Sequence, residues 1–228
     1  MLFFGPLCMG RNRHHAAFMC GTNMVIRREA LEQVGGMCED NIAEDFLTSL
    51  FIQEKGWDSV YVPEVLAEGL APEDFRSYYS QQLRWARGSL EVAFKFNPLF
   101  RRGLTWAQRI EYLSAATYYL TGTVVLINAL LPVMFFFTGA VPLMVATMAL
   151  AAIFLPYIVV TLSALQASAN FSYTFRALAF SLSSFSIHLK ALGAMLTRQA
   201  TAFAVTSKRA QQGNFLRLAL PQILYFVV

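Results

Sequence analysis

The sequence predicts an α/β module followed by an α-helical transmembrane region with interfacial helices. Of its 228 residues, 56% are hydrophobic and only 14% are charged, and the mean hydropathy is +0.46. This composition lies outside the range of ordinary soluble domains. From Tyr112 to Phe175 there is no Asp, Glu, Lys, Arg or His, and about 64 such residues suffice for two membrane spans. Residues 1–97 instead alternate between β-prone and helix-prone stretches, as α/β domains do.

The N-terminal module is expected to contain two strand regions and three helices. Residues 16–26 are apolar and β-prone, and residues 27–36 resemble a short helix that ends at a pair of glycines. A second helix, residues 42–56, gathers its apolar side chains on one face and ends at a glycine. Residues 57–71 supply one or two short strands. A third helix is expected from Pro72, a residue type that suits the first helical turn.

The rest of the chain is expected to be helical and tied to the membrane. In residues 98–117 apolar positions alternate with charged ones, as in an interfacial helix. Two spans are predicted at residues 118–138 and 141–165, joined by a tight turn in the sequence TGAVP. Residues 215–228 resemble the start of a further span.

Residues 173–197 are long and apolar enough to cross a membrane, yet they contain Arg176, His188 and Lys190. If this segment crossed, Lys208 would lie on the side opposite the α/β module, against the tendency of basic residues to stay on the cytoplasmic side. We therefore interpret it as a helix that lies in the cytoplasmic interface.

Charge and cysteine content limit the possible environments and partners. The net charge is +4, and the basic residues flank both ends of the apolar block but are absent from its turn, so both flanks are expected in the cytoplasm. Because these residues border lipid-like segments, the chain is not expected to bind nucleic acid. The three widely spaced residues Cys8, Cys20 and Cys38 suggest a reduced compartment without a disulfide or zinc framework.

The run QQLRW places three different binding groups on one face of the third predicted helix. Gln81, Arg84, Trp85 and Gly88 follow helical spacing. An amide, a guanidinium and an indole offer hydrogen bonds, a clamp for phosphate and a stacking surface, a set that suits a nucleotide-sugar. Alternatively, the helix rests on a membrane surface, with Arg84 and Arg87 near lipid headgroups and Trp85 as an anchor.

Two shorter motifs are further candidates. Glu44 and Asp45 fall in the first turn of a predicted helix, where an ionised Asp can serve as a general base. Acidic residues are also common there simply as caps. Cys20 precedes Gly21 at the end of a predicted strand, where a glycine permits close approach of a ligand. Alternatively, Cys20 is a buried structural residue.

The run FAVTSKR lies in a polar loop, residues 199–213, between two membrane-associated segments. Its hydroxyl and ammonium groups suit closure over a diphosphate, or it is a cytoplasmic loop whose basic end merely sets topology. The four side chains concerned are Phe203, Val205, Thr206 and Lys208.

Taken in order, CGTN, AED, QQLRW and FAVTSK resemble the motifs of the processive, membrane-embedded family 2 glycosyltransferases of the bacterial cellulose synthase type. The resemblance covers nearly the whole chain. It implies that residues 1–97 are the C-terminal half of a GT-A-like domain. It also implies inverting transfer of a sugar from a UDP-sugar to the non-reducing end of a growing polysaccharide, most simply a β-glucan. This transfer would be coupled to translocation of the polymer across the cell (inner) membrane. The protein would be a multi-pass membrane protein whose catalytic part is cytoplasmic.

The resemblance also implies a role for each motif. Asp45 would deprotonate the acceptor hydroxyl, although Ala43 stands where the family has Thr. Gln81 and Arg84 would hold the donor pyrophosphate, and Trp85 would stack on the acceptor sugar. The remaining residues would line the acceptor end (Cys20, Glu44) or form a gating loop over the donor (Phe203, Val205, Thr206, Lys208).

Other implications concern cofactors, partners and what this chain lacks. Mg²⁺ or Mn²⁺ is expected for the complete enzyme, but the family's metal-binding and uridine-binding aspartates would lie upstream, and the chain contains no Asp-x-Asp pair. We therefore expect an incomplete part of the enzyme that is inactive alone. The expected partners are a UDP-sugar, a polysaccharide and a lipid membrane; accessory synthase subunits stay unknown. The alternatives are a synthase with another UDP-sugar, chitin-like or hyaluronan-like, and a non-catalytic membrane scaffold.

Overall fold

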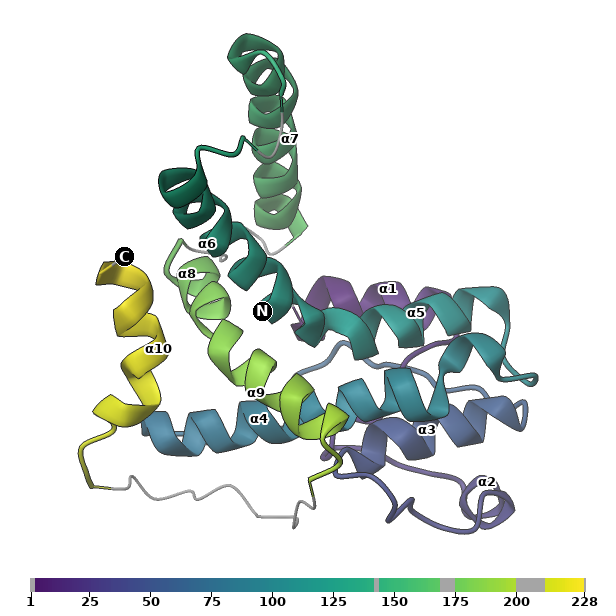
Figure 1. Cartoon of the computed structure of the whole chain (residues 1–228). Helices are drawn as coiled ribbons and strands as arrows, with labels where there is room; N and C mark the ends of the chain where they lie inside the picture. The colour runs from purple at the N-terminus through teal and green to yellow at the C-terminus, as the bar shows by residue number, and fades with distance from the viewer. Residues whose placement is uncertain (1–2, 142–143, 169–174, 200–211, 228) are drawn as a thin grey trace.

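The computed structural model describes residues 3–141, 144–168, 175–199 and 212–227. Regular structure within these four ranges is helical (Figure 1). The helices are α1 (Cys8–Arg13), α2 (Arg28–Gln33), α3 (Glu44–Glu54), α4 (Phe75–Glu91), α5 (Trp106–Thr117), α6 (Thr121–Thr138), α7 (Thr147–Ser168), α8 (Phe175–Ser183), α9 (Phe185–Leu196) and α10 (Leu216–Val227). Short turns of other helical types are η1 (Phe3–Leu7), η2 (Val92–Phe96), η3 (Pro98–Phe100) and η4 (Tyr118–Leu120).

The predicted strand regions contain no strand in the part of the chain that the structure describes, so the α/β prediction is confirmed only in its helices. A strand needs ladder hydrogen bonds to a neighbouring segment. The first region bonds instead to side chains of α3: the Met19 N–H donates to Ser49 Oγ at 2.8 Å, and Gln53 Nε2 donates to the Ala17 carbonyl at 2.6 Å. These contacts satisfy backbone groups of an apolar segment without a sheet.

The three helices predicted for the N-terminal module are present as α2, α3 and α4, with shifted ends. α4 begins at Phe75 rather than at Pro72. Asp74 caps it, since its Oδ1 accepts the Ser77 N–H at 2.9 Å. A side-chain cap of this kind satisfies one of the amides that a helix start leaves without a partner, and so fixes where the helix begins.

The main core forms where α3 packs against η2 and α5. Leu47 and Leu50 of α3 are fully buried, together with Tyr112 of α5 and Val92 of η2. The ring of Phe46 lies 5.3 Å from that of Tyr112, centroid to centroid. Burial of each leucine side chain contributes about 1.5–3 kcal/mol, so this cluster anchors the N-terminal end of α3, where the acidic motif lies.

α4 is the helix of the N-terminal module that packs against α9 of the membrane region. Its Ala86 and Leu90 are fully buried and pack with Ala191 of α9, and α9 lies over α4 (Figure 1). At the end of this contact, Arg87 Nη2 donates to the carbonyl of Gln199. One side of α4 is therefore covered by α9, while another side faces the start of α3.

Within the described ranges, three helical segments are long and apolar enough to cross a membrane: Trp106–Thr138, Thr147–Ala167 and Ala179–Leu196. α6 and α7 project from the other helices (Figure 1), and most of their large apolar side chains are exposed. The predicted span at 118–138 coincides with η4 and α6, whereas α7 begins six residues later than the start predicted for the second span, at Thr147.

The third segment is the one predicted as an interfacial helix at 173–197. It is divided into α8 and α9 at Ser184, and α9 packs on α4, a helix with a polar face. Length and composition alone would also permit it to cross. Its placement in the interface, like that of residues 98–117, stays a prediction.

Candidate active site

Asp45 lies in the first turn of α3, close to the segment Cys20–Gly21. A Cβ atom on Gly21 would lie 3.5 Å from Asp45 Oδ2. Gly21 has φ of +79°, a conformation that favours glycine. The other carboxylate oxygen, Oδ1, accepts the Phe46 N–H at 2.7 Å. The structure therefore brings the CGTN and AED motifs together, although they are far apart in sequence.

The half-buried position of Asp45 has a direct effect on its acidity. The pKa of Asp45 is raised above its usual value, mainly by burial and also by the charge of Glu44. The hydrogen bond from the Phe46 N–H and the charge of Arg84 lower the pKa in part. A carboxylate with a raised pKa holds a proton more tightly, which is the property that a general base needs. The same carboxylate stays accessible enough to meet a ligand.

Cys20 lies beside this carboxylate as a neutral thiol. The hydrogen bond between the Cys20 and Cys8 side chains raises the pKa of Cys20, and burial raises it further. The Cys20 Sγ also donates to the Phe18 carbonyl at 3.6 Å. A protonated, half-buried thiol is a poor nucleophile, so Cys20 is suited to line a site rather than to react.

The helix that carries QQLRW approaches the same turn closely at Gly88. A Cβ atom on Gly88 would lie 2.6 Å from Ala43 Cβ and 2.9 Å from the Ala43 amide nitrogen, distances at which no side chain fits. Arg84 lies one turn before Gly88, and its charge acts on Asp45. The close packing of α4 against the start of α3 thus places a guanidinium near the carboxylate.

The other two residues of the QxxRW pattern lie on the same side of α4. Gln81 and Arg84 are half-buried, whereas Trp85 is 43% exposed. An exposed indole offers a flat face on which a sugar ring can stack. Of the residues predicted for the site, contacts and charges therefore connect Cys20, Asp45 and Arg84, whereas Gln81 and Trp85 are placed only by their positions on α4.

The fourth predicted motif cannot be placed in the same way. Phe203, Val205, Thr206 and Lys208 lie outside the described residues. The chain that leads to them ends, as far as it is described, at Gln199, which is held by Arg87 of α4.

Sequence reasoning missed the contacts by which Asn41 holds α4 against the turn before α3 and the burial of the Arg87–Glu91 pair beside it. Asn41 is buried, its Oδ1 accepts the Ala43 N–H at 2.7 Å, and its Nδ2 donates to the Gly88 carbonyl at 3.2 Å. Glu91 and Arg87 form an ion pair with Nε to Oε1 at 3.0 Å. The i,i+4 spacing of the charged pair and the position of Asn41 just before a helix were the available signals.

The described residues do not provide a metal site. No group of three or more His, Cys, Asp or Glu side chains is arranged to hold an ion there.

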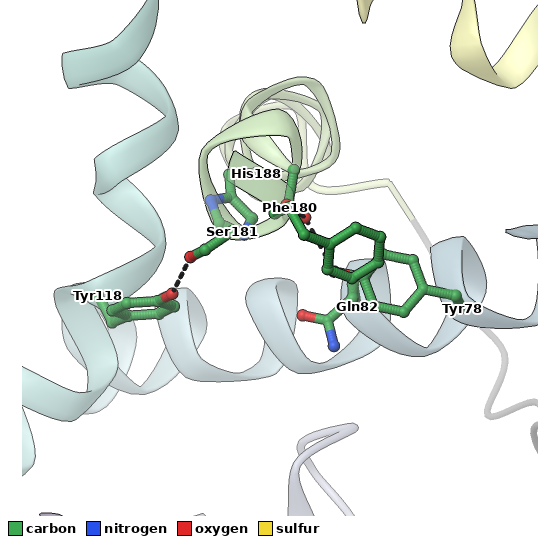
Figure 2. A pocket seen from close by; sticks show the side chains of 7 residues that line it. Tyr78, Gln82, Tyr118, Phe180, Ser181 and His188 are labelled. Carbon is green, nitrogen blue, oxygen red and sulfur yellow. Dashed lines mark hydrogen bonds between the residues drawn. The ribbon is translucent and has the colours of Figure 1, made fainter. Parts of the chain in front are cut away.

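A separate cavity of about 130 Å³ borders the next face of α4, between η4, α8 and α9 (Figure 2). Its hydroxyl groups pair with each other: Tyr78 Oη lies 2.8 Å from Ser184 Oγ, and Tyr118 Oη lies 3.0 Å from Ser181 Oγ. These pairs join α4 and η4 to the α8–α9 segment. Because they already satisfy one another, we assign the cavity to helix packing and not to chemistry.

Comparison with known proteins identifies a matching family and several similar relatives. The model of the family described as "Glycosyl transferase family group 2" matches residues 3–206. Cellulose synthase 1 of Komagataeibacter xylinus is 39% identical over 156 residues, which cover 68% of this chain and 10% of that protein. The cellulose synthase catalytic subunit [UDP-forming] of Komagataeibacter sucrofermentans is 36% identical over 156 residues, 68% of this chain and 21% of that protein.

The protein with the same name in Xanthomonas axonopodis pv. citri is 40% identical over 121 residues, 53% of this chain and 17% of that protein. The chain thus spans about a tenth to a fifth of the length of these curated relatives.

Proposed function

Because the chain belongs to glycosyl transferase family group 2, we propose that it forms part of an enzyme that transfers a sugar from a UDP-sugar to the non-reducing end of a growing polysaccharide. The names of its relatives, cellulose synthase and UDP-forming catalytic subunit, favour a cellulose-like β-glucan. The observation that carries the proposal is the arrangement of one carboxylate, Asp45, between the glycine turn at Gly21 and the α4 helix that bears Arg84.

The geometry supports an inverting displacement in one step. Asp45 takes the proton of the acceptor hydroxyl through Oδ2, the oxygen that faces Gly21. The acceptor oxygen then forms a bond to the anomeric carbon as the bond from that carbon to UDP breaks. Arg84 stabilises the negative charge that develops on the leaving diphosphate. Attack on the face opposite the leaving group inverts the configuration of the carbon.

The remaining motif residues take supporting roles in this proposal. Gln81 binds the donor diphosphate together with Arg84, and Trp85 stacks on the acceptor sugar. The acceptor end is lined by Cys20 and Glu44. The loop that follows α9 closes over the donor with four side chains, Phe203, Val205, Thr206 and Lys208. Mg²⁺ or Mn²⁺, which would neutralise diphosphate charge, would be held by ligands outside this chain.

The proposed placement in the cell (inner) membrane follows from the exposed apolar helices and the distribution of charge. Residues 1–97 would face the cytoplasm as the C-terminal half of a GT-A-like domain. α6 and α7 would cross, and the polymer would be translocated beside them. The packing of α9 on α4 supports an interfacial position for residues 173–197, and the alternation of charge supports the same for residues 98–117.

The test is UDP release in membranes that contain the full-length protein, with several UDP-sugars as donors. We expect native protein to release UDP with one donor and Asp45→Asn to lose at least about 100-fold in rate, since general-base catalysis contributes roughly 10²–10⁴-fold. Asp40→Asn is the matched control, because Asp40 is exposed in the segment before α3. Equal rates for native protein and Asp45→Asn would refute the proposal and favour a non-catalytic scaffold.

A further inference from the structure

Asn41 lies at the point where the turn before α3 meets α4, and only 6% of its surface is exposed. Its side-chain oxygen accepts the Ala43 N–H at 2.7 Å. Its side-chain nitrogen donates to the Gly88 carbonyl at 3.2 Å and to Glu91 Oε2 at 3.4 Å. A primary amide is the side-chain group that offers one acceptor and two donors in this arrangement. The fit is therefore specific to the chemistry of asparagine.

The partners of Asn41 belong to the two elements that carry the proposed chemistry. Ala43 is the N-cap residue of α3 and precedes Asp45 by two positions. Gly88 follows Arg84 by one helical turn on α4. Asn41 thus connects the backbone that carries the proposed base to the backbone that carries the proposed donor-binding guanidinium, by bonds that span 47 residues of sequence.

Two charged residues of α4 fix the orientation of the Asn41 amide. Glu91 accepts from Asn41 through Oε2 and from Arg87 Nε through Oε1, the latter at 3.0 Å. The glutamate has only acceptors when ionised, so it requires the NH₂ group of Asn41 on its side and leaves the amide oxygen for Ala43. Arg87 is only 5% exposed and also donates to the Gln199 carbonyl. Arg87 is buried and the Glu91 side chain is only partly exposed, so their ion pair is weakly screened by salt.

We propose that Asn41 is a positioning residue that sets the separation and orientation of Asp45 relative to Arg84, and thereby aligns the acceptor with the donor diphosphate. Asn41 touches neither substrate in this proposal. It acts through the position of Asp45, which must face the acceptor hydroxyl at hydrogen-bond distance. This inference rests on the proposed function, because it assigns Asp45 and Arg84 their roles.

The experiment uses the full-length protein in membranes and compares Asn41→Ala with Asn12→Ala. Asn12 is a matched control because its side chain also accepts a backbone N–H, that of Tyr61 at 2.8 Å, but does not connect α3 to α4. We expect Asn41→Ala to lower kcat on the order of 10- to 100-fold, as a misplacement of about 1 Å does. The KM for the donor should change less, and Asn12→Ala should keep the native kcat.

A pH profile separates positioning from a loss of folded protein. If Asn41→Ala frees the turn, Asp45 gains solvent and its raised pKa falls, so the acid limb of the kcat profile moves to lower pH. A smaller amount of folded protein would lower kcat at every pH without moving that limb. An Asn41→Ala profile that coincides with that of Asn12→Ala, at equal amounts of protein, would overturn the inference.

A second pair of variants covers the case in which Asn41→Ala does not accumulate. Asn41→Asp keeps the acceptor for Ala43 but places a carboxylate against Glu91, so kcat should fall as in Asn41→Ala. Adding Glu91→Gln supplies an amide at position 91 that can donate to that carboxylate, and part of the loss in kcat should return. A native kcat in the Asn41→Asp variant, or a lowered kcat that Glu91→Gln does not raise, would also overturn the inference.

The outcomes distinguish this inference from the proposed function. If Asp45→Asn is inactive while both Asn41 variants behave like Asn12→Ala, only the positioning role fails. If Asp45→Asn keeps the native rate, the proposed function itself fails.

Discussion

Replacement of Gly88 by alanine tests whether the contact between α4 and the start of α3 holds the candidate site together. The added Cβ would lie 2.6 Å from Ala43 Cβ and 3.0 Å from Asn41 Oδ1. Carbon atoms in contact are ordinarily about 3.5–4.0 Å apart. The two elements must therefore separate by roughly 1 Å to accept the methyl group, and neither neighbour is the flexible end of a long side chain.

The expected effect on stability is the difference of two terms. Overpacking of this kind costs about 1–3 kcal/mol, whereas alanine is favoured over glycine within a helix by about 1 kcal/mol. The net loss of about 0–2 kcal/mol leaves the protein folded. The expected loss of activity is larger, because a displacement of about 1 Å can lower kcat on the order of 100-fold.

The assay is UDP release at saturating donor, measured beside thermal inactivation of the same membranes. Gly193→Ala is the control, since Gly193 lies in α9 and a Cβ there meets no atom within 4 Å. It should keep the native kcat and inactivate at an equal or higher temperature. Native kcat in Gly88→Ala would show that the close approach of α4 to Ala43 does not govern the chemistry, and would refute the reasoning.

Two more predictions concern single side chains of the site. Because burial raises the pKa of Asp45, the stabilising contribution of this carboxyl group is complete below its unfolded-state pKa and is lost as the pH rises through the folded-state pKa. Asp45→Asn should therefore resist thermal inactivation at pH 7 at least as well as native protein. A marked loss of resistance in this variant would contradict the burial argument. Trp85→Ala should raise the acceptor KM roughly 2- to 10-fold, since aromatic contacts of this kind contribute about 0.5–1.5 kcal/mol. Trp85→Phe should keep most of the native acceptor affinity, and equal acceptor KM values for native protein and Trp85→Ala would exclude stacking.

The helices of the N-terminal module were predictable because their signals are local. α3 and α4 show apolar residues at helical spacing, and the acidic side chains near their starts suit helix N-termini. Their first residues were less predictable. The helix was expected from Pro72, whereas in the structure it begins at Phe75 with Asp74 as its cap.

The strand predictions failed for the opposite reason. Whether an apolar segment such as residues 16–26 becomes a strand depends on whether another segment pairs with it. The local sequence does not reveal such a partner. The structure uses Ser49 and Gln53 of α3 to satisfy part of this backbone. Those two hydrogen bonds join positions 30 and 36 residues apart.

The grouping of CGTN, AED and QQLRW was expected only through the resemblance to a known family. The bonds that produce it were not visible in the sequence. Asn41 has no motif around it, and Gly88 was noted only as part of a stripe on α4. Their importance comes from a contact between segments 47 residues apart, which single-sequence patterns do not reveal.

Because α4 packs against both α3 and α9, the N-terminal module and the membrane region share packed side chains and are not structurally independent. The helix that carries Arg84 is covered by α9, which lies about 100 residues later in the chain. Truncation after residue 97 would uncover Ala86 and Leu90, an apolar stripe that promotes aggregation in water. A chimera that takes its membrane region from a relative would therefore have to take α4 and α9 from the same protein. In this respect the contact between the two helices resembles an obligate interface between subunits.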